Sequence, residues 1–93
     1  HLFGQVQVGM ALINPNFEIL DVNNALCSIL KYRRKEVLNE NILNLLDKSE
    51  VNKLKEHIQE ISVDKSDHYD SECKLLTKGG EEVHVILKII KMK

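Results

Sequence analysis

The sequence lacks most of the features that mark specialised chemistry. It contains no tryptophan and only two tyrosines and two phenylalanines, so 4% of its residues are aromatic. This scarcity argues against a flavin site, where aromatic rings would stack on the cofactor. No run reaches the ~18 apolar residues that a membrane-spanning helix requires, and no signal-peptide pattern opens the chain. We therefore expect no direct membrane contact.

Charge and cysteine content are equally unremarkable. Thirteen lysines and arginines stand against 14 acidic residues, for a net charge of −1, so nothing in the charge balance attracts nucleic acid. Cys27 and Cys73 form neither a C-x-x-C pair nor a disulfide framework, and they suit a reducing, cytoplasmic environment. The four histidines show no metal-binding spacing. We predict no metal, no nucleic-acid partner and a cytoplasmic location, either free or as the cytosolic part of a membrane-bound receptor.

The chain has the size and composition of one small soluble domain. It has 93 residues, of which 43% are hydrophobic and 29% charged, enough to bury a modest core. We predict a single domain over residues 1–93, in which residues 1–7 are a tag remnant and a lead-in segment.

The N-terminal third predicts a hairpin followed at once by a short helix. Apolar runs at Val8–Ile13 and Phe17–Val22 flank Asn14-Pro15-Asn16, whose residue types favour a turn. Asn23-Asn24 can then cap a helix over Asn24–Lys31, where apolar residues recur at helical spacing.

The rest of the chain predicts helices first and strands last. Asp47 and Glu50 form a capping-box pattern, in which Asp47 accepts from the first turn and Glu50 reaches back. A second hairpin turns at Gly79-Gly80, which supply positive φ. This order predicts an α+β fold, with four strands in one antiparallel sheet and the helices across one face. The predicted later elements are short helical pieces at Lys35–Asn39 and Asn41–Leu46, the long helix Ser49–Ser62, and strands at His68–Thr77 and Glu82–Met92.

Several local patterns, in this order, resemble a PAS domain, the sensory-box module of signal-transduction proteins. They are V-N-x-A-L-C-x-I-L-x-Y at residues 22–32, K-E-V-L at 35–38, the acidic-centred strand at 69–74 and K-G-G at 78–80. The resemblance runs from Val8 to Met92. It implies a sensory input module that binds a small ligand or a partner and regulates an attached output domain, such as a histidine kinase or a diguanylate cyclase. The alternatives are a ligand-free dimerisation scaffold and a heme- or flavin-based redox or gas sensor.

The chain departs from the family pattern in length and at turn glycines. PAS domains usually have a fifth strand between the first and fourth, whereas this sequence ends after four. Either the chain was cut short, or the last strand pairs directly with Val8–Ile13, or a second copy fills the gap. Phe17 stands at a usual turn glycine, so we expect positive φ at Asn16. Lys31 and Asn39 replace glycines at helix ends.

The candidate sites are a pocket, one histidine and an apolar surface. No nucleophile elbow or phosphate loop is present, so we predict no enzyme. His57 lies on the long helix, from which heme-binding PAS domains present a ligand, but it sits at the margin of the apolar stripe, so an ordinary surface role is favoured and no cofactor is predicted. A homodimer is expected through Leu2, Phe3, Ile86 and Ile90, unless the lead-in segment covers that face. The predicted pocket lies between the helices and the sheet, where plain core packing is the competing interpretation: Cys27, Leu30, Ile42, Leu54, Ile58, Cys73, Leu75 and Val85.

Overall fold

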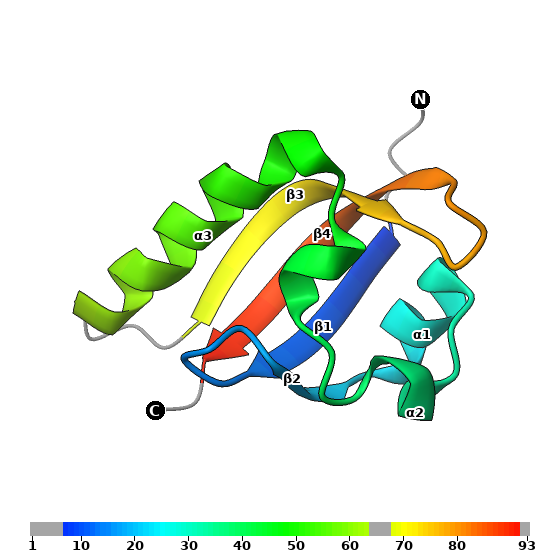
Figure 1. Cartoon of the computed structure of the whole chain (residues 1–93), viewed down its shortest axis with the longest axis horizontal. Helices are drawn as coiled ribbons and strands as arrows, with labels where there is room; N and C mark the ends of the chain where they lie inside the picture. The colour runs from blue at the N-terminus through cyan, green and yellow to red at the C-terminus, as the bar shows by residue number, and fades with distance from the viewer. Residues whose placement is uncertain (1–6, 64–67, 92–93) are drawn as a thin grey trace.

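The computed structural model describes residues 7–63 and 68–91. Two hairpins enclose a helical section in the predicted order, which confirms the α+β fold (Figure 1). The elements are β1 (Gln7–Ile13), β2 (Ile19–Val22), α1 (Asn24–Leu30), α2 (Arg34–Val37), the 3-10 helix η2 (Ile42–Leu45), α3 (Lys48–Val63), β3 (His68–Leu76) and β4 (Glu82–Lys91).

The strands form one four-stranded sheet in the order β2-β1-β4-β3. The β1–β2 and β3–β4 pairs are antiparallel, whereas β1 and β4 are parallel, from Gln7 opposite Val85 to Ile13 opposite Lys91. The prediction of a wholly antiparallel sheet is therefore wrong at this central pair. The helical section between the two hairpins supplies the long crossover that parallel neighbours require. The last strand thus pairs directly with the first.

The hydrophobic core lies between the helices and one face of the sheet. Alternation along the strands turns Ala11 and Ile13 of β1, and Val85, Leu87 and Ile89 of β4, toward that face, and all five are buried. In Figure 1, α3 runs beside β3, while α1 and α2 lie toward the β1–β2 side. Buried residues of the helical section complete this core: Leu26, Leu30, Val37, Ile42, Leu45, Leu46 and Leu54.

Both edges of the sheet are partly covered by the chain that links the helices. Next to β2, Ile19 donates its backbone N–H to the carbonyl of Glu40 and accepts from Asn39, each at 2.8 Å. Next to β3, Leu46 bridges to Leu75. Covered edges offer fewer free backbone groups for pairing with another chain. The sheet's outer face, opposite the helices, is therefore the more open surface.

Within residues 7–63 and 68–91, three residues other than glycine adopt positive φ: Phe17 (67°), Lys31 (62°) and Asn39 (69°). Lys31 and Asn39 stand where the family pattern usually has glycine, whereas the prediction of positive φ at Asn16 is wrong. The Asn14 side-chain oxygen accepts the backbone N–H groups of Asn16 and Glu18, at 2.9 and 3.0 Å. This clamp places the left-handed residue one position later, at Phe17.

Two side-chain caps fix the helices against the sheet. Asn23 Oδ1 accepts the backbone N–H of Leu26 in α1 and that of Met10 in β1, both at 3.0 Å. Asp47 accepts from Ser49 as predicted. Glu50 does not close the box, because its carboxylate instead accepts the backbone N–H of Lys74 in β3 at 3.2 Å.

Candidate functional site

Six of the eight predicted pocket residues belong to the hydrophobic core. Leu30, Ile42, Leu54, Cys73, Leu75 and Val85 are all buried, and Cys27 is half-buried. The side chain of Ile58 lies outside the described residues. A crevice lined by Leu26, Cys27 and Leu30, among others, has no room for a water molecule. Burial also raises the pKa of the Cys73 thiol, which keeps it neutral.

His57 joins α3 to β3. Its Nδ1 is hydrogen-bonded to the Tyr69 hydroxyl, and the two ring centroids are 5.1 Å apart. The ring is half-buried. A histidine engaged in this way has a structural explanation, and nothing in the contact favours heme ligation. The contact with Tyr69 therefore accounts for His57 as a structural residue.

Ile86 and Ile90 lie on the outer face of the sheet, as the dimer prediction requires, whereas Leu2 and Phe3 lie outside the described residues. Val8 pairs with Ile86 and Leu12 with Ile90 across the parallel seam. Val8 and Met10 are 41% and 39% exposed. We call this surface the outer patch, and it consists of Val8, Met10, Leu12, Ile86 and Ile90.

Sequence reasoning missed the contribution of β1 to the outer patch. The signal was present, because Val8, Met10 and Leu12 alternate with Gly9, Ala11 and Ile13, and alternate residues of a strand face opposite sides. Both faces of β1 are apolar, so its sequence reads as one continuous hydrophobic run. A continuous run indicates a strand but does not reveal an uncovered face.

The outer patch has a distinct shape and one lysine among its apolar side chains. A shallow depression of about 270 Å³ opens between β1, β2 and Ile90. Lys88 of β4 lies on this face between Ile86 and Ile90, in register with Met10, and it pairs with Asp70 of β3 at 3.5 Å. Farther along the same two strands, Glu72 lies 3.9 Å from His84. The apolar side chains of the patch therefore flank one lysine, whose charge is paired toward β3.

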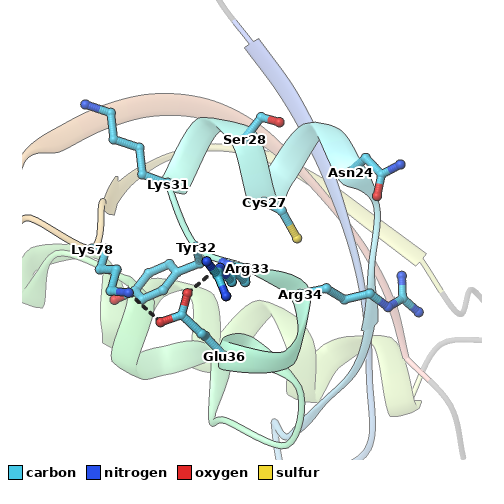
Figure 2. A pocket seen from close by; sticks show the side chains of 9 residues that line it. All are labelled: Asn24, Cys27, Ser28, Lys31, Tyr32, Arg33, Arg34, Glu36 and Lys78. Carbon is cyan, nitrogen blue, oxygen red and sulfur yellow. Dashed lines mark hydrogen bonds and ion pairs between the residues drawn. The ribbon is translucent and has the colours of Figure 1, made fainter.

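A second surface feature lies between α1, α2 and the β3–β4 turn (Figure 2). It is an open cleft of about 590 Å³, within the range of small-molecule sites. Four of its nine lining residues are lysine or arginine, and one is glutamate. We call it the cationic cleft, and its lining residues are Asn24, Cys27, Ser28, Lys31, Tyr32, Arg33, Arg34, Glu36 and Lys78.

Glu36 is the carboxylate of the cationic cleft. It accepts the Lys78 ammonium at 2.5 Å and the backbone N–H of Arg33 at 2.8 Å. The hydrogen bond from Lys78, followed by that from Arg33, lowers the pKa of Glu36. Figure 2 shows this carboxylate between Lys78 and the start of α2, below the thiol of Cys27.

Two other cations of the cleft form ion pairs with carboxylates outside its lining. Lys31 pairs with Glu81 at 3.3 Å. Arg34 pairs with Asp21 and also donates to the carbonyl of Val22 at 2.9 Å, which ties α2 to β2. Sequence reasoning did not identify this cleft, because Lys78 is more than 40 residues from the cations of α1 and α2.

No helix within residues 7–63 and 68–91 is long and apolar enough to cross a membrane. Within the same ranges, no three histidine, cysteine or acidic side chains gather where they could hold a metal ion.

Known proteins share this fold. The family model described as "PAS domain" matches residues 7–93. A crystal structure of the PAS domain of a protein from Colwellia psychrerythraea superimposes with a TM-score of 0.64 at 13% identity, covering 75% of this chain and 58% of that one. A PAS domain from a two-component sensor histidine kinase gives 0.58 at 19% identity, covering 77% and 60%. The chain thus matches about three fifths of the length of these solved chains. No curated protein matches the sequence.

Proposed function

Because this chain belongs to the PAS domain family, we propose that it is the sensory input module of a cytoplasmic signalling protein, and that it regulates an attached output domain through a second copy bound to its outer patch. The observation that carries the proposal is the outer patch itself. It is apolar and uncovered among the described residues, and it lies on the two central strands of the sheet.

The position of the outer patch suits the transmission of a signal. Its members belong to β1 and β4, the first and last strands. Any domain joined before residue 7 or after residue 91 would connect directly to these strands. A change in how two copies pack at the patch would then reach the attached domains. Such a change requires only that a ligand or partner binds one arrangement better than the other.

The proposed output domain is a histidine kinase, with a diguanylate cyclase as the alternative. The likeness to a PAS domain from a two-component sensor histidine kinase supports the first. The free thiols Cys27 and Cys73 support the cytoplasmic location. We assign the domain no catalytic role of its own. In the full-length protein, it would regulate the attached output domain.

A second copy fits the outer patch better than pairing at a sheet edge does. Covering Val8 and Met10 on both copies would bury apolar side chains that are now two-fifths exposed. A symmetric pair would place the same patch on each side of a two-fold axis. The edges, by contrast, already bond to the segments around residues 39–42 and 46–50.

Sedimentation equilibrium of matched variants tests this proposal. We expect the wild-type protein to sediment as a dimer and Val8→Glu as a folded monomer, because Val8 lies opposite Ile86 and its replacement would bury an unpaired carboxylate in the interface. Leu20→Glu is the matched control, since Leu20 is 41% exposed but lies on β2 outside the patch. It should remain dimeric. A monomeric wild type, or equal loss of dimer in both variants, would contradict the proposal.

A further inference from the structure

We propose that the cationic cleft is a binding site for a small molecule with clustered anionic oxygens, either phosphoryl groups or several carboxylates. Both arginines of the chain line this cleft, in a protein whose net charge is −1. Its lining includes four cations and one carboxylate, Glu36. Lys78 pairs with Glu36, and Lys31 and Arg34 pair with Glu81 and Asp21 outside the lining. One positive charge, that of Arg33, is left for an anionic ligand to neutralise.

Arg33 is the cation available to a ligand. Its guanidinium makes no hydrogen bond or ion pair with the residues that the structure describes, although its backbone N–H is bonded to Glu36. Guanidinium groups bind carboxylate and phosphate oxygens through two parallel hydrogen bonds. Arg34 lies next to it, is half exposed, and retains donors beyond those bonded to Asp21 and Val22.

Glu36 shows how an anionic oxygen is held at this place. Its carboxylate already accepts one ammonium and one backbone N–H, and the lowered pKa reports that the charged form is stabilised. A ligand with several such oxygens could bond to Arg33 and compete with Glu36 for Lys78. Its remaining oxygens could accept from the hydroxyl groups of Ser28 and Tyr32, which also line the cleft.

Binding at the cationic cleft would act on the turn that leads into β4. Three contacts join that turn to the α1–α2 corner. Lys78 N–H donates to the Leu30 carbonyl at 2.9 Å, Lys78 pairs with Glu36, and Glu81 pairs with Lys31. A ligand that draws Lys78 away from Glu36 would break one of these contacts. The turn could then shift, and with it β4, which carries Ile86 and Ile90. This coupling rests on the proposed function, whereas binding itself does not.

The test is a titration followed by amide chemical shifts of the ¹⁵N-labelled protein. The probes are inorganic pyrophosphate and citrate, with sodium chloride adjusted to hold the ionic strength constant. We expect saturable shifts at the amides of Arg33, Arg34 and Lys78. The probe that binds more tightly identifies phosphoryl or carboxylate chemistry. Absence of saturation with both probes would overturn the proposal.

Two variants with the same charge change make the test specific. Arg33→Gln removes the unpaired guanidinium and should weaken binding by about tenfold. Lys35→Gln is the control, because Lys35 is exposed on the same short helix but does not line the cleft. It should change affinity by less than about twofold. Equal losses in both variants would show general charge screening and refute the site. The Val8→Glu variant should bind as the wild type does, so failure of the dimer and failure of the site are distinguishable.

Discussion

At Gly9 the first strand and the first helix approach more closely than any side chain would allow. A Cβ atom built at this residue would lie 2.5 Å from Leu26 Cδ1 and 2.9 Å from Leu26 Cβ. Asn23 holds the two elements at this separation, because its side-chain oxygen bonds to both Met10 and Leu26. The absence of a side chain at Gly9 is therefore what lets α1 pack onto β1.

The substitution Gly9→Ala should lower the free energy of unfolding by about 1–3 kcal/mol, because α1 must shift to admit the methyl group. Urea unfolding followed by circular dichroism measures this change. Gly79→Ala is the control, since its nearest neighbour would be 3.9 Å away, and it should change stability by less than about 0.5 kcal/mol. A Gly9→Ala protein as stable as the wild type would show that the helix is not seated as described.

Phe17 and Lys31 both adopt positive φ, but the sequence indicates only one of these positions. Lys31 follows α1, where Tyr32 N–H donates to Cys27 O and Lys31 N–H donates to Ser28 O, the two bonds of a helix end that requires a left-handed residue. The family pattern, in which glycine usually stands at this helix end, indicates this position. Phe17 was not predictable, because asparagine is the better left-handed residue and the clamp by Asn14 depends on the folded turn.

At the scale of elements, α2 depends on one side chain, that of Glu36. Arg33 is the N-cap residue before this four-residue helix, and its side chain cannot accept a hydrogen bond, so the backbone of the first turn gains no cap from it. Glu36 compensates from inside the helix by accepting the Arg33 N–H, and Lys78 holds the carboxylate from the β3–β4 turn. One carboxylate thus caps the helix and connects it to the sheet.

Glu36 should make stability depend on pH. A carboxyl group whose pKa is lower in the folded state stabilises the fold above its unfolded-state pKa, and this contribution is lost as the pH falls through the folded-state pKa. Glu36→Gln should therefore be less stable than the wild type near neutral pH, and the difference should shrink in acid, below about pH 4.

Urea midpoints measured from about pH 7 to about pH 3 would follow this difference. Glu56→Gln is a suitable control, because it removes an exposed carboxylate from α3. Its curve should run parallel to that of the wild type. If the Glu36→Gln and wild-type curves are also parallel over the whole range, the carboxylate does not make the contribution assigned to it.

At the scale of the whole molecule, the order of the elements could be predicted from the sequence, and their boundaries to within about two residues. The long helix was expected at Ser49–Ser62 and spans Lys48–Val63, because its apolar stripe is local information. The pairing of β1 with β4 was one alternative among several, and its parallel direction was not predicted. Neighbours in a sheet that are distant in sequence leave little local trace, since a strand pattern specifies a face but not a partner.

The outer patch and the cationic cleft also differ in how far the sequence could predict them. The outer patch follows from alternation in β1 and β4 once those strands are known to be neighbours. The cationic cleft depends on folding, which brings Lys78 beside Glu36, 42 residues away. The sequence itself places both arginines side by side, whereas only the fold adds Lys78 to them.

The central claim is that the outer patch of one copy packs against the outer patch of another. The most direct measurement is an isotope-filtered nuclear Overhauser experiment on an equal mixture of ¹³C-labelled and unlabelled protein. The account predicts intermolecular cross-peaks from the methyl groups of Val8, Met10 and Ile90. Intermolecular cross-peaks only from the helical side, or none at concentrations where the protein sediments as a dimer, would contradict it.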